Sequence, residues 1–140
     1  METLNAMSAR SIQYYVISRK WSSDLSFYKI ETAFLHRLIE DHFIMLSAPE
    51  NIDALKTAGK KLLRLEVEIS NADKVLADQI KQIELMTEDI IIEDAEALAV
   101  TQVQLEKMIG EITCQFRELK INLFELVEHV MKNRNIQFYS

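Results

Sequence analysis

The feature that most constrains the fold is a heptad repeat in the middle of the chain. Leucine or isoleucine recurs every seven residues, and the position three residues later is apolar in every heptad but one. The first set is Leu55, Leu62, Ile69, Leu76 and Ile83, and the second is Ala58, Leu65, Ala72, Gln79 and Met86. Two such positions form one stripe along a helix, as in coiled coils. The repeat therefore predicts a long helix over about residues 48–86.

Scarce helix breakers extend this interpretation to the whole chain. Only two glycines and one proline occur among 140 residues, against roughly 7% and 5% in ordinary proteins. Few breakers imply few connections, so we expect one all-α domain, residues 1–140. It should hold three long antiparallel, coiled-coil-like helices at about 22–46, 48–86 and 87–133, after an N-terminal segment 1–20. A four-helix bundle is the alternative, if that segment or a break at Gly110 supplies a fourth helix.

The expected helix boundaries rest on capping residues. Ser22 or Ser23 can cap the first helix, and Ser47 with Glu50 has the spacing of a capping box for the second. Thr87 can cap the third helix. Apolar positions stay in phase on both sides of Gly110, which favours one continuous third helix over two shorter ones.

Charge and composition argue against several classes of function. The net charge of −6 is unfavourable for nucleic acid, because phosphate binding relies on clustered Lys and Arg. No apolar run approaches the roughly 18 residues that a membrane span needs. The single cysteine, Cys114, and the lack of a continuous apolar stretch near the N-terminus favour a cytoplasmic protein. We expect no partner nucleic acid and no membrane contact.

The stretch ETAFLHRLIEDHF, residues 31–43, has the densest set of possible metal ligands. On a helix whose apolar arc is centred on Leu38 and includes Phe27 and Phe34, His36 and Glu40 point to solvent. Glu31 and His42 fall inside the arc, where each should find its own partner from another helix, because a buried unpaired charge is costly. Eleven residues separate Glu31 from His42, which is too far for them to share an ion.

A second possible ligand pair is Glu125 and His129, one turn apart in the third helix. The segment HRLIE is similar in spacing to the His-x-x-x-Glu of hemerythrin-like proteins, which use more histidines than the three of this chain. The Glu-x-x-His pairs of ferritin-like bundles do not occur. Glu31, His36, Glu40, His42, Glu125 and His129 are thus weak metal candidates, and we expect neither a metal nor another cofactor.

Catalytic patterns are missing from the sequence as well. The two glycines lie apart within helical segments, so they form no phosphate loop. Cys114 has no histidine placed beside it in the sequence. We therefore expect a non-enzymatic interaction or scaffold module that self-associates. The alternative is a metal- or small-ligand-binding bundle using Glu31 and His42.

The third helix carries a second apolar stripe, nearly opposite its main one. It includes Val103, Gly110, Cys114 and Ile121. A helix that is apolar on two sides is usually packed between partners. This stripe is a candidate interface.

The end of the hairpin around Thr87 is acidic. No Lys or Arg occurs between residues 82 and 106, whereas seven Asp or Glu do: Glu84, Glu88, Asp89, Glu93, Asp94, Glu96 and Glu106. Such a run usually keeps a surface solvated, and it is also a candidate docking site for a basic protein.

The helix lengths leave part of the hairpin bare. A first helix of about 37 Å cannot cover arms of about 57 Å at 1.5 Å per residue. The uncovered apolar residues would be Leu76, Ile83, Ile90, Ile91 and Leu98. Soluble monomers seldom expose such a patch, so we expect at least a dimer. The intramolecular alternative is that the N-terminal segment covers these residues.

Overall fold

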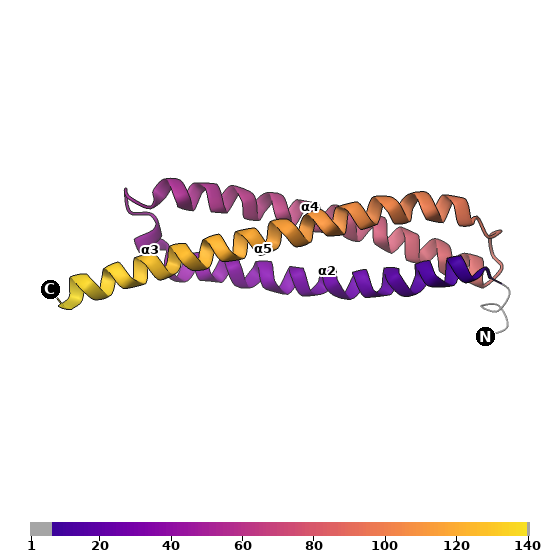
Figure 1. The fold of residues 1–140 in the computed structure, drawn as a ribbon, viewed down its shortest axis with the longest axis horizontal. Coiled ribbons are helices and arrows are strands. Elements are labelled where there is room, and N and C mark those ends of the chain that lie inside the picture. The colour runs from indigo at the N-terminus through magenta and orange to yellow at the C-terminus, as the bar shows by residue number, and fades with distance from the viewer. Residues whose placement is uncertain (1–6, 140) are drawn as a thin grey trace.

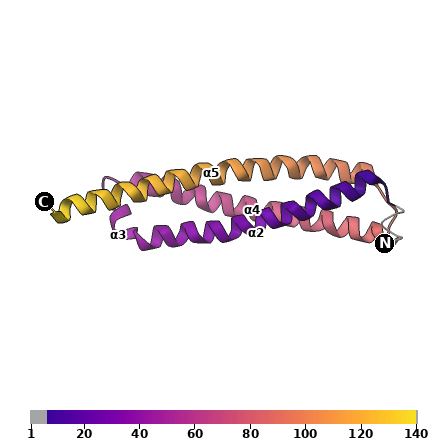
Figure 2. The same cartoon turned by 60° about the horizontal axis from the view of Figure 1, so that its bottom comes forward.

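Three long helices pack side by side into a rod. The computed structural model describes the backbone of residues 7–139 and the side chains of residues 7–133. Its helices are α2 (Ala9–Asp41), α3 (Phe43–Leu46), α4 (Ile52–Thr87) and α5 (Ala95–Tyr139). Helices α2, α4 and α5 alternate in direction, and each contacts the other two (Figure 1, Figure 2). The predicted all-α bundle class is confirmed.

The heptad positions of α4 form the centre of the core. All ten positions predicted from the repeat are buried. The one polar member, Gln79, donates from Nε2 to the backbone oxygen of Leu98 (2.9 Å) and to Oε1 of Gln102 (3.1 Å), both on α5. Ser18 of α2 donates to the same Gln102 oxygen at 3.4 Å. Each long helix thus contributes a side chain to one buried polar layer.

The first helix begins much earlier than the sequence predicted. Ser8, not Ser22 or Ser23, is its N-cap, and the Ser8 hydroxyl oxygen accepts from the backbone N–H of Ser11 at 3.1 Å. Helix α2 has its own heptad of buried residues, which are Ser11, Ser18, Leu25 and Thr32. Three residues after each of them comes a large side chain: Tyr14, Trp21, Tyr28 and Leu35. The small residues let α2 approach its neighbours while the large ones pack around them. Three of the four heptad positions, Ser11, Ser18 and Thr32, are small and polar, which hid the repeat.

The first helix also ends earlier than 46. Helix α2 stops at Asp41, and α3 forms a separate short turn before the first connection. Ser47 follows α3, and its hydroxyl donates back to the Ile44 backbone oxygen at 3.1 Å. The predicted capping box of Ser47 and Glu50 is therefore wrong, and α4 begins only at Ile52. The buried Asn51 side chain ties this connection to α3 by donating to the Met45 oxygen at 3.1 Å.

The second connection, residues 88–94, separates α4 from α5. Asp89 has a positive φ of 57°. Its N–H donates to the Met86 oxygen (3.2 Å), and the next N–H, of Ile90, donates to the Leu85 oxygen (3.0 Å). These two bonds are those of a Schellman motif. The prediction that Thr87 caps the third helix is wrong, because Thr87 ends α4.

Asp94 caps the third helix instead. Its Oδ1 accepts from the backbone N–H of Ala97 at 3.0 Å, and α5 begins at Ala95 rather than at 87. Helix α5 then continues through Gly110 without a break, as predicted, and ends at Tyr139 rather than near 133. At 45 residues it is about 67 Å long, and its C-terminal end projects past α3 (Figure 1). Among the described helices, none has the length and apolar character to cross a membrane.

Candidate interaction surface

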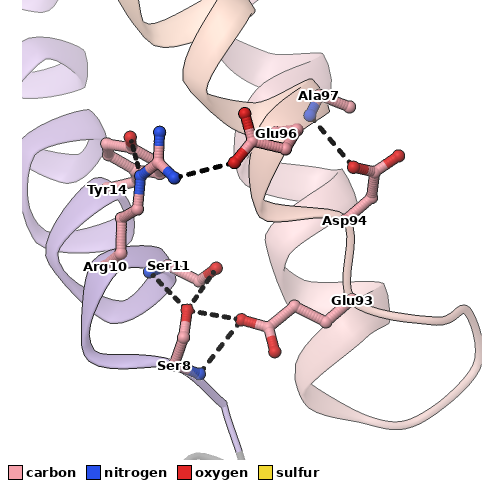
Figure 3. Close-up of polar contacts among 8 residues, drawn as sticks. All are labelled: Ser8, Arg10, Ser11, Tyr14, Glu93, Asp94, Glu96 and Ala97. Atoms are coloured by element: carbon pink, nitrogen blue, oxygen red, sulfur yellow. Dashed lines mark hydrogen bonds and ion pairs between the residues drawn. The ribbon is translucent and has the colours of Figure 1, made fainter.

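The acidic end of the hairpin holds the start of α2 in place (Figure 3). Glu93 accepts from the backbone N–H of Ser8 at 3.0 Å and from the Ser8 hydroxyl at 2.7 Å through its Oε1. A carboxylate at a helix N-terminus is stabilised by the unpaired N–H groups and the positive end of the helix dipole. Beside it, Arg10 forms an ion pair with Glu96 at 3.0 Å. Two acidic side chains of this end are thus used within the chain.

These contacts shift two ionisation equilibria. Hydrogen bonds from Ser11 and Ser8 lower the pKa of Glu93 below its usual value, because they favour the charged carboxylate. Hydrogen bonds to Tyr14 and Glu96 raise the pKa of the Arg10 guanidinium. The end of the hairpin is therefore organised around a carboxylate that is ionised at neutral pH. The acidic side chains Glu93 and Glu96 thus hold the start of α2. This use within the chain weakens the hypothesis that the acidic end is a docking site for a basic protein.

Glu31 has the interhelical partner that the sequence required. Lys120 of α5 donates to Oε1 of Glu31 at 3.2 Å, and four-fifths of the Glu31 side chain is buried. The ammonium of Lys120 also lies 5.7 and 5.6 Å from the ring centroids of Phe116 and Phe124. An apolar surround of this kind strengthens an ion pair by excluding water. The prediction for Glu31 is confirmed, and the pair fixes α2 against α5.

The arc centred on Leu38 predicted that His36 and Glu40 both point to solvent. For His36 this prediction is wrong. His36 hydrogen-bonds Glu66 of α4 and is only partly exposed, whereas Glu40 is exposed. The arc was misphased because it counted Phe27 and Phe34 as core residues. Their side chains are 53% and 42% exposed.

The other metal candidates do not join Glu31 or His36 in one site. His42 lies between α2 and α3 and is partly buried, but its Nδ1 bonds the Leu38 backbone oxygen of α2 at 3.0 Å rather than a group of α4 or α5, so the prediction of a partner from another helix is wrong for His42. Glu125 is exposed, and His129 contacts Asn133 at 3.1 Å between Nε2 and Nδ2. Within the described part of the chain, no group of three His, Cys, Asp or Glu side chains could hold a metal ion.

The hairpin residues expected to be bare are covered by α2. Leu76, Ile83 and Leu98 are at most 2% exposed. Met7, with Ile12, Tyr14 and Tyr15, packs against the cluster that contains Ile83 and Leu98, and Ile91 joins it from the connection. Of the five residues, Ile90 is exposed. The reason is that α2, at about 50 Å, is longer than the expected first helix, so the intramolecular alternative is correct for this region.

The second apolar stripe of α5 faces outward along most of its length. Val103 and Ile121 are 68% and 51% exposed, and Cys114 is exposed. A Cβ added at Gly110 would meet no atom within 4 Å. Val100, 73% exposed, extends the stripe by one turn. We call Val100, Val103, Gly110, Cys114, Ile121 and Phe124 the outer stripe.

An aromatic patch on α2 adjoins the outer stripe, and the sequence analysis missed it. Phe124 of α5 lies edge-on to Phe34 of α2, with ring centroids 6.5 Å apart. Phe27 and Ile30, two turns and one turn earlier in α2, are 53% and 69% exposed. The heptad of small residues in α2 places these side chains outward, and it is the signal that could have found them. Exposed apolar side chains thus extend from α5 onto α2.

Comparison of the chain with protein-family models, with curated proteins and with solved structures finds no match. Inferences about function therefore depend on the geometry of the bundle and its surface.

Proposed function

We propose that this chain is a non-enzymatic helical interaction module that self-associates through the outer stripe of α5. The observation that carries the proposal is an apolar stripe on the outside of a bundle whose core is already complete. Contiguous exposed apolar surface of this kind usually marks an interaction site. A rod of long helices can present such a stripe as a straight and continuous surface.

The polar side chains support the same class of function. Glu31 with Lys120 and His36 with Glu66 each join two helices, and Glu93 fixes the start of α2. These groups serve to hold helices together, which is the work expected of a scaffold. The alternative of a metal or ligand site built on Glu31 and His42 is less well supported, because each of the two already has a separate partner.

Light scattering over a wide range of protein concentration tests self-association. We expect the mass to rise from that of one chain toward that of two. Ile121→Asp should keep the protein monomeric at concentrations where the unchanged chain dimerises, because a charge in an apolar contact is costly to desolvate. Val67→Asp is the matched control, since Val67 is 59% exposed on α4 and lies outside the stripe. A monomeric mass at every concentration would contradict the proposal.

A further inference from the structure

The residues of the outer stripe are spaced symmetrically on the two sides of Ile112. Gly110 and Cys114 lie two residues before and after Ile112, Val103 and Ile121 lie nine residues away, and Val100 and Phe124 lie twelve away. A two-fold axis that relates antiparallel helices brings residues equally far from the centre opposite each other. The symmetry of the stripe thus matches a second copy of the same helix running the other way.

The opposed residues also suit one another in size. In such a pair Gly110 would lie opposite Cys114 of the second copy, and Val103 opposite Ile121. Each small side chain would therefore meet a larger one, which is how helix surfaces interdigitate. Gly110 costs α5 helical stability relative to alanine, and a Cβ at this position would meet no atom of the described residues within 4 Å. Close approach of a second helix would explain the glycine.

Charged residues flank the stripe in a complementary pattern. Lys107 and Glu118 lie on one flank, and Glu106 and Arg117 lie on the other; all four are exposed. None forms an ion pair within the described residues, whose ion pairs involve other side chains. When two antiparallel helices are related by a two-fold axis, each flank of one helix lies beside the same flank of the other. Lys107 would then face Glu118 of the second copy, and Arg117 would face Glu106, with each pair formed twice.

The direction follows from the acidic end of the hairpin. A parallel arrangement would also bring opposite charges together on the flanks, because Lys107 would face Glu106 of the second copy. It would, however, place the two acidic ends side by side. Seven Asp or Glu residues and no Lys or Arg occur between residues 82 and 106 of each chain, so like charges would repel. The antiparallel arrangement puts these ends at opposite extremes of the dimer.

From these observations we infer that two copies of the chain pair antiparallel through the outer stripes of α5, with the two-fold axis at the level of Ile112. The inference rests on the proposed self-association through this stripe and adds its direction and the position of its axis. The stripe from Val100 to Phe124 is about 36 Å long and one helix wide. An interface of this size belongs to the small, reversible class, so a dissociation constant of roughly micromolar order is expected.

A charge exchange on one flank tests the inference, with the dissociation constant measured by sedimentation equilibrium. Lys107→Glu should weaken the dimer by about tenfold, because two ion pairs become two repulsions. Adding Glu118→Lys to the same chain should restore the affinity, since the two exchanged side chains would again bring opposite charges together between the copies. Lys74→Glu, an exposed change on α4, is the matched control and should have little effect.

The possible outcomes separate the two proposals. Restoration by the double variant, with an unaffected control, supports the antiparallel pairing. A dimer that is weakened by Lys107→Glu and weakened further by Glu118→Lys is parallel, which overturns the inference but not the proposed function. A dimer insensitive to both changes does not pair along these flanks, which overturns the inference; if Ile121→Asp also leaves that dimer intact, the outer stripe is not the surface of self-association and the proposed function is contradicted as well. A chain that is monomeric before any substitution contradicts the proposed function itself.

Discussion

At the scale of single residues, Asp89 shows how α4, the helix with the heptad repeat, is terminated. Its φ of 57° lies in the left-handed region, which costs a residue with a side chain roughly 1–2 kcal/mol relative to the right-handed one. Aspartate is among the side chains that tolerate this region best, and glycine has no such cost. The Schellman bonds at Met86 and Leu85 depend on this conformation.

Asp89→Gly should therefore stabilise the protein. We expect a gain of about 0.5–1 kcal/mol in the free energy of unfolding, because the relief of strain exceeds the added flexibility of the unfolded chain. Asp78→Gly is the matched control, since Asp78 is exposed inside α4, where glycine lowers helix stability. Urea unfolding of both variants checks the opposite signs. Destabilisation by both changes would show that Asp89 is not strained.

The buried polar layer predicts unequal effects for two similar substitutions. Gln79→Met should cost about 1–3 kcal/mol, because it leaves the buried Gln102 amide without its best partner. Gln102→Met should be neutral or stabilising. It removes a buried Nε2 that has no hydrogen-bond partner among the described residues, while Gln79 keeps its bond to the Leu98 oxygen. Thermal unfolding of the two variants decides between this order and its reverse, which would mean that Gln102 holds the layer together.

Glu93 predicts a pH dependence of stability at acidic pH. Its pKa is lowered in the folded protein from a usual value of 4.5. The resulting stabilisation is fully present above pH 4.5 and is lost as the pH falls through the folded pKa. Glu93→Gln should thus be less stable than the unchanged protein at pH 7, and the difference should vanish in acid.

Urea unfolding at a series of pH values measures this difference. Glu88→Gln is the control, because Glu88 lies in the same connection and its carboxylate makes no hydrogen bond among the described residues. A difference for Glu93→Gln that does not change with pH would argue against an ionised contact with the start of α2.

At the scale of elements, predictability from sequence depended on what occupies each heptad. In α4 all the positions except Gln79 are apolar, and all ten were found. In α2 three of the four positions of the same repeat are Ser11, Ser18 and Thr32, so hydrophobicity alone could not reveal it. Small polar side chains are buried there because neighbouring helices come close, and that closeness is a property of the assembled bundle.

The candidate surface was partly predictable for the same physical reason. Val103, Cys114 and Ile121 lie in a helix whose main stripe was clear, so its opposite face could be identified. The sequence predicted that Glu31 has a partner on another helix, but it did not identify Lys120 as that partner. The contact of His36 with Glu66 was missed because Phe27 and Phe34 were assigned to the core. An exposed aromatic residue breaks the rule on which such assignments rest.

Gly110 gives a prediction about α5 as an element. Gly110→Ala should raise the stability of the monomer by about 1 kcal/mol, because alanine favours helix and its Cβ meets no atom of the chain. The same change should weaken the dimer, because the second helix is held further away. Gly59→Ala in α4 is the matched control, since a Cβ there also meets nothing. It should give similar stabilisation with unchanged association, measured by urea unfolding and sedimentation.

One outcome for Gly110→Ala would contradict the proposed contact of α5 with a second helix. If the variant is stabilised and dimerises as well as the Gly59→Ala control, close approach at residue 110 plays no part in association. The two-fold axis of the dimer would then have to lie at another level of the outer stripe.

At the scale of the whole molecule, the length of α2 decides what is inside the protein and what is outside. Because it begins at Ala9, it covers the end of the hairpin that a shorter helix would leave bare. Ile83 is consequently a core residue, 1% exposed, whereas Ile121 remains on the surface. Isoleucine thus has two environments in one bundle: Ile83 lies in the core, and Ile121 lies on the surface that we propose for association.

The same substitution at these two isoleucines should therefore have different effects. Ile83→Asp buries an unpaired carboxylate, so we expect it to cost about 3 kcal/mol or more and to unfold the end of the bundle near Met86. Ile121→Asp should change the stability of the monomer by only about 0.5 kcal/mol while abolishing association. Circular dichroism during urea unfolding, at concentrations where the chain is monomeric, distinguishes the two. If Ile83→Asp instead stayed fully folded and lost only its dimer, α2 would not cover the hairpin in solution, and the interface would lie at Ile83.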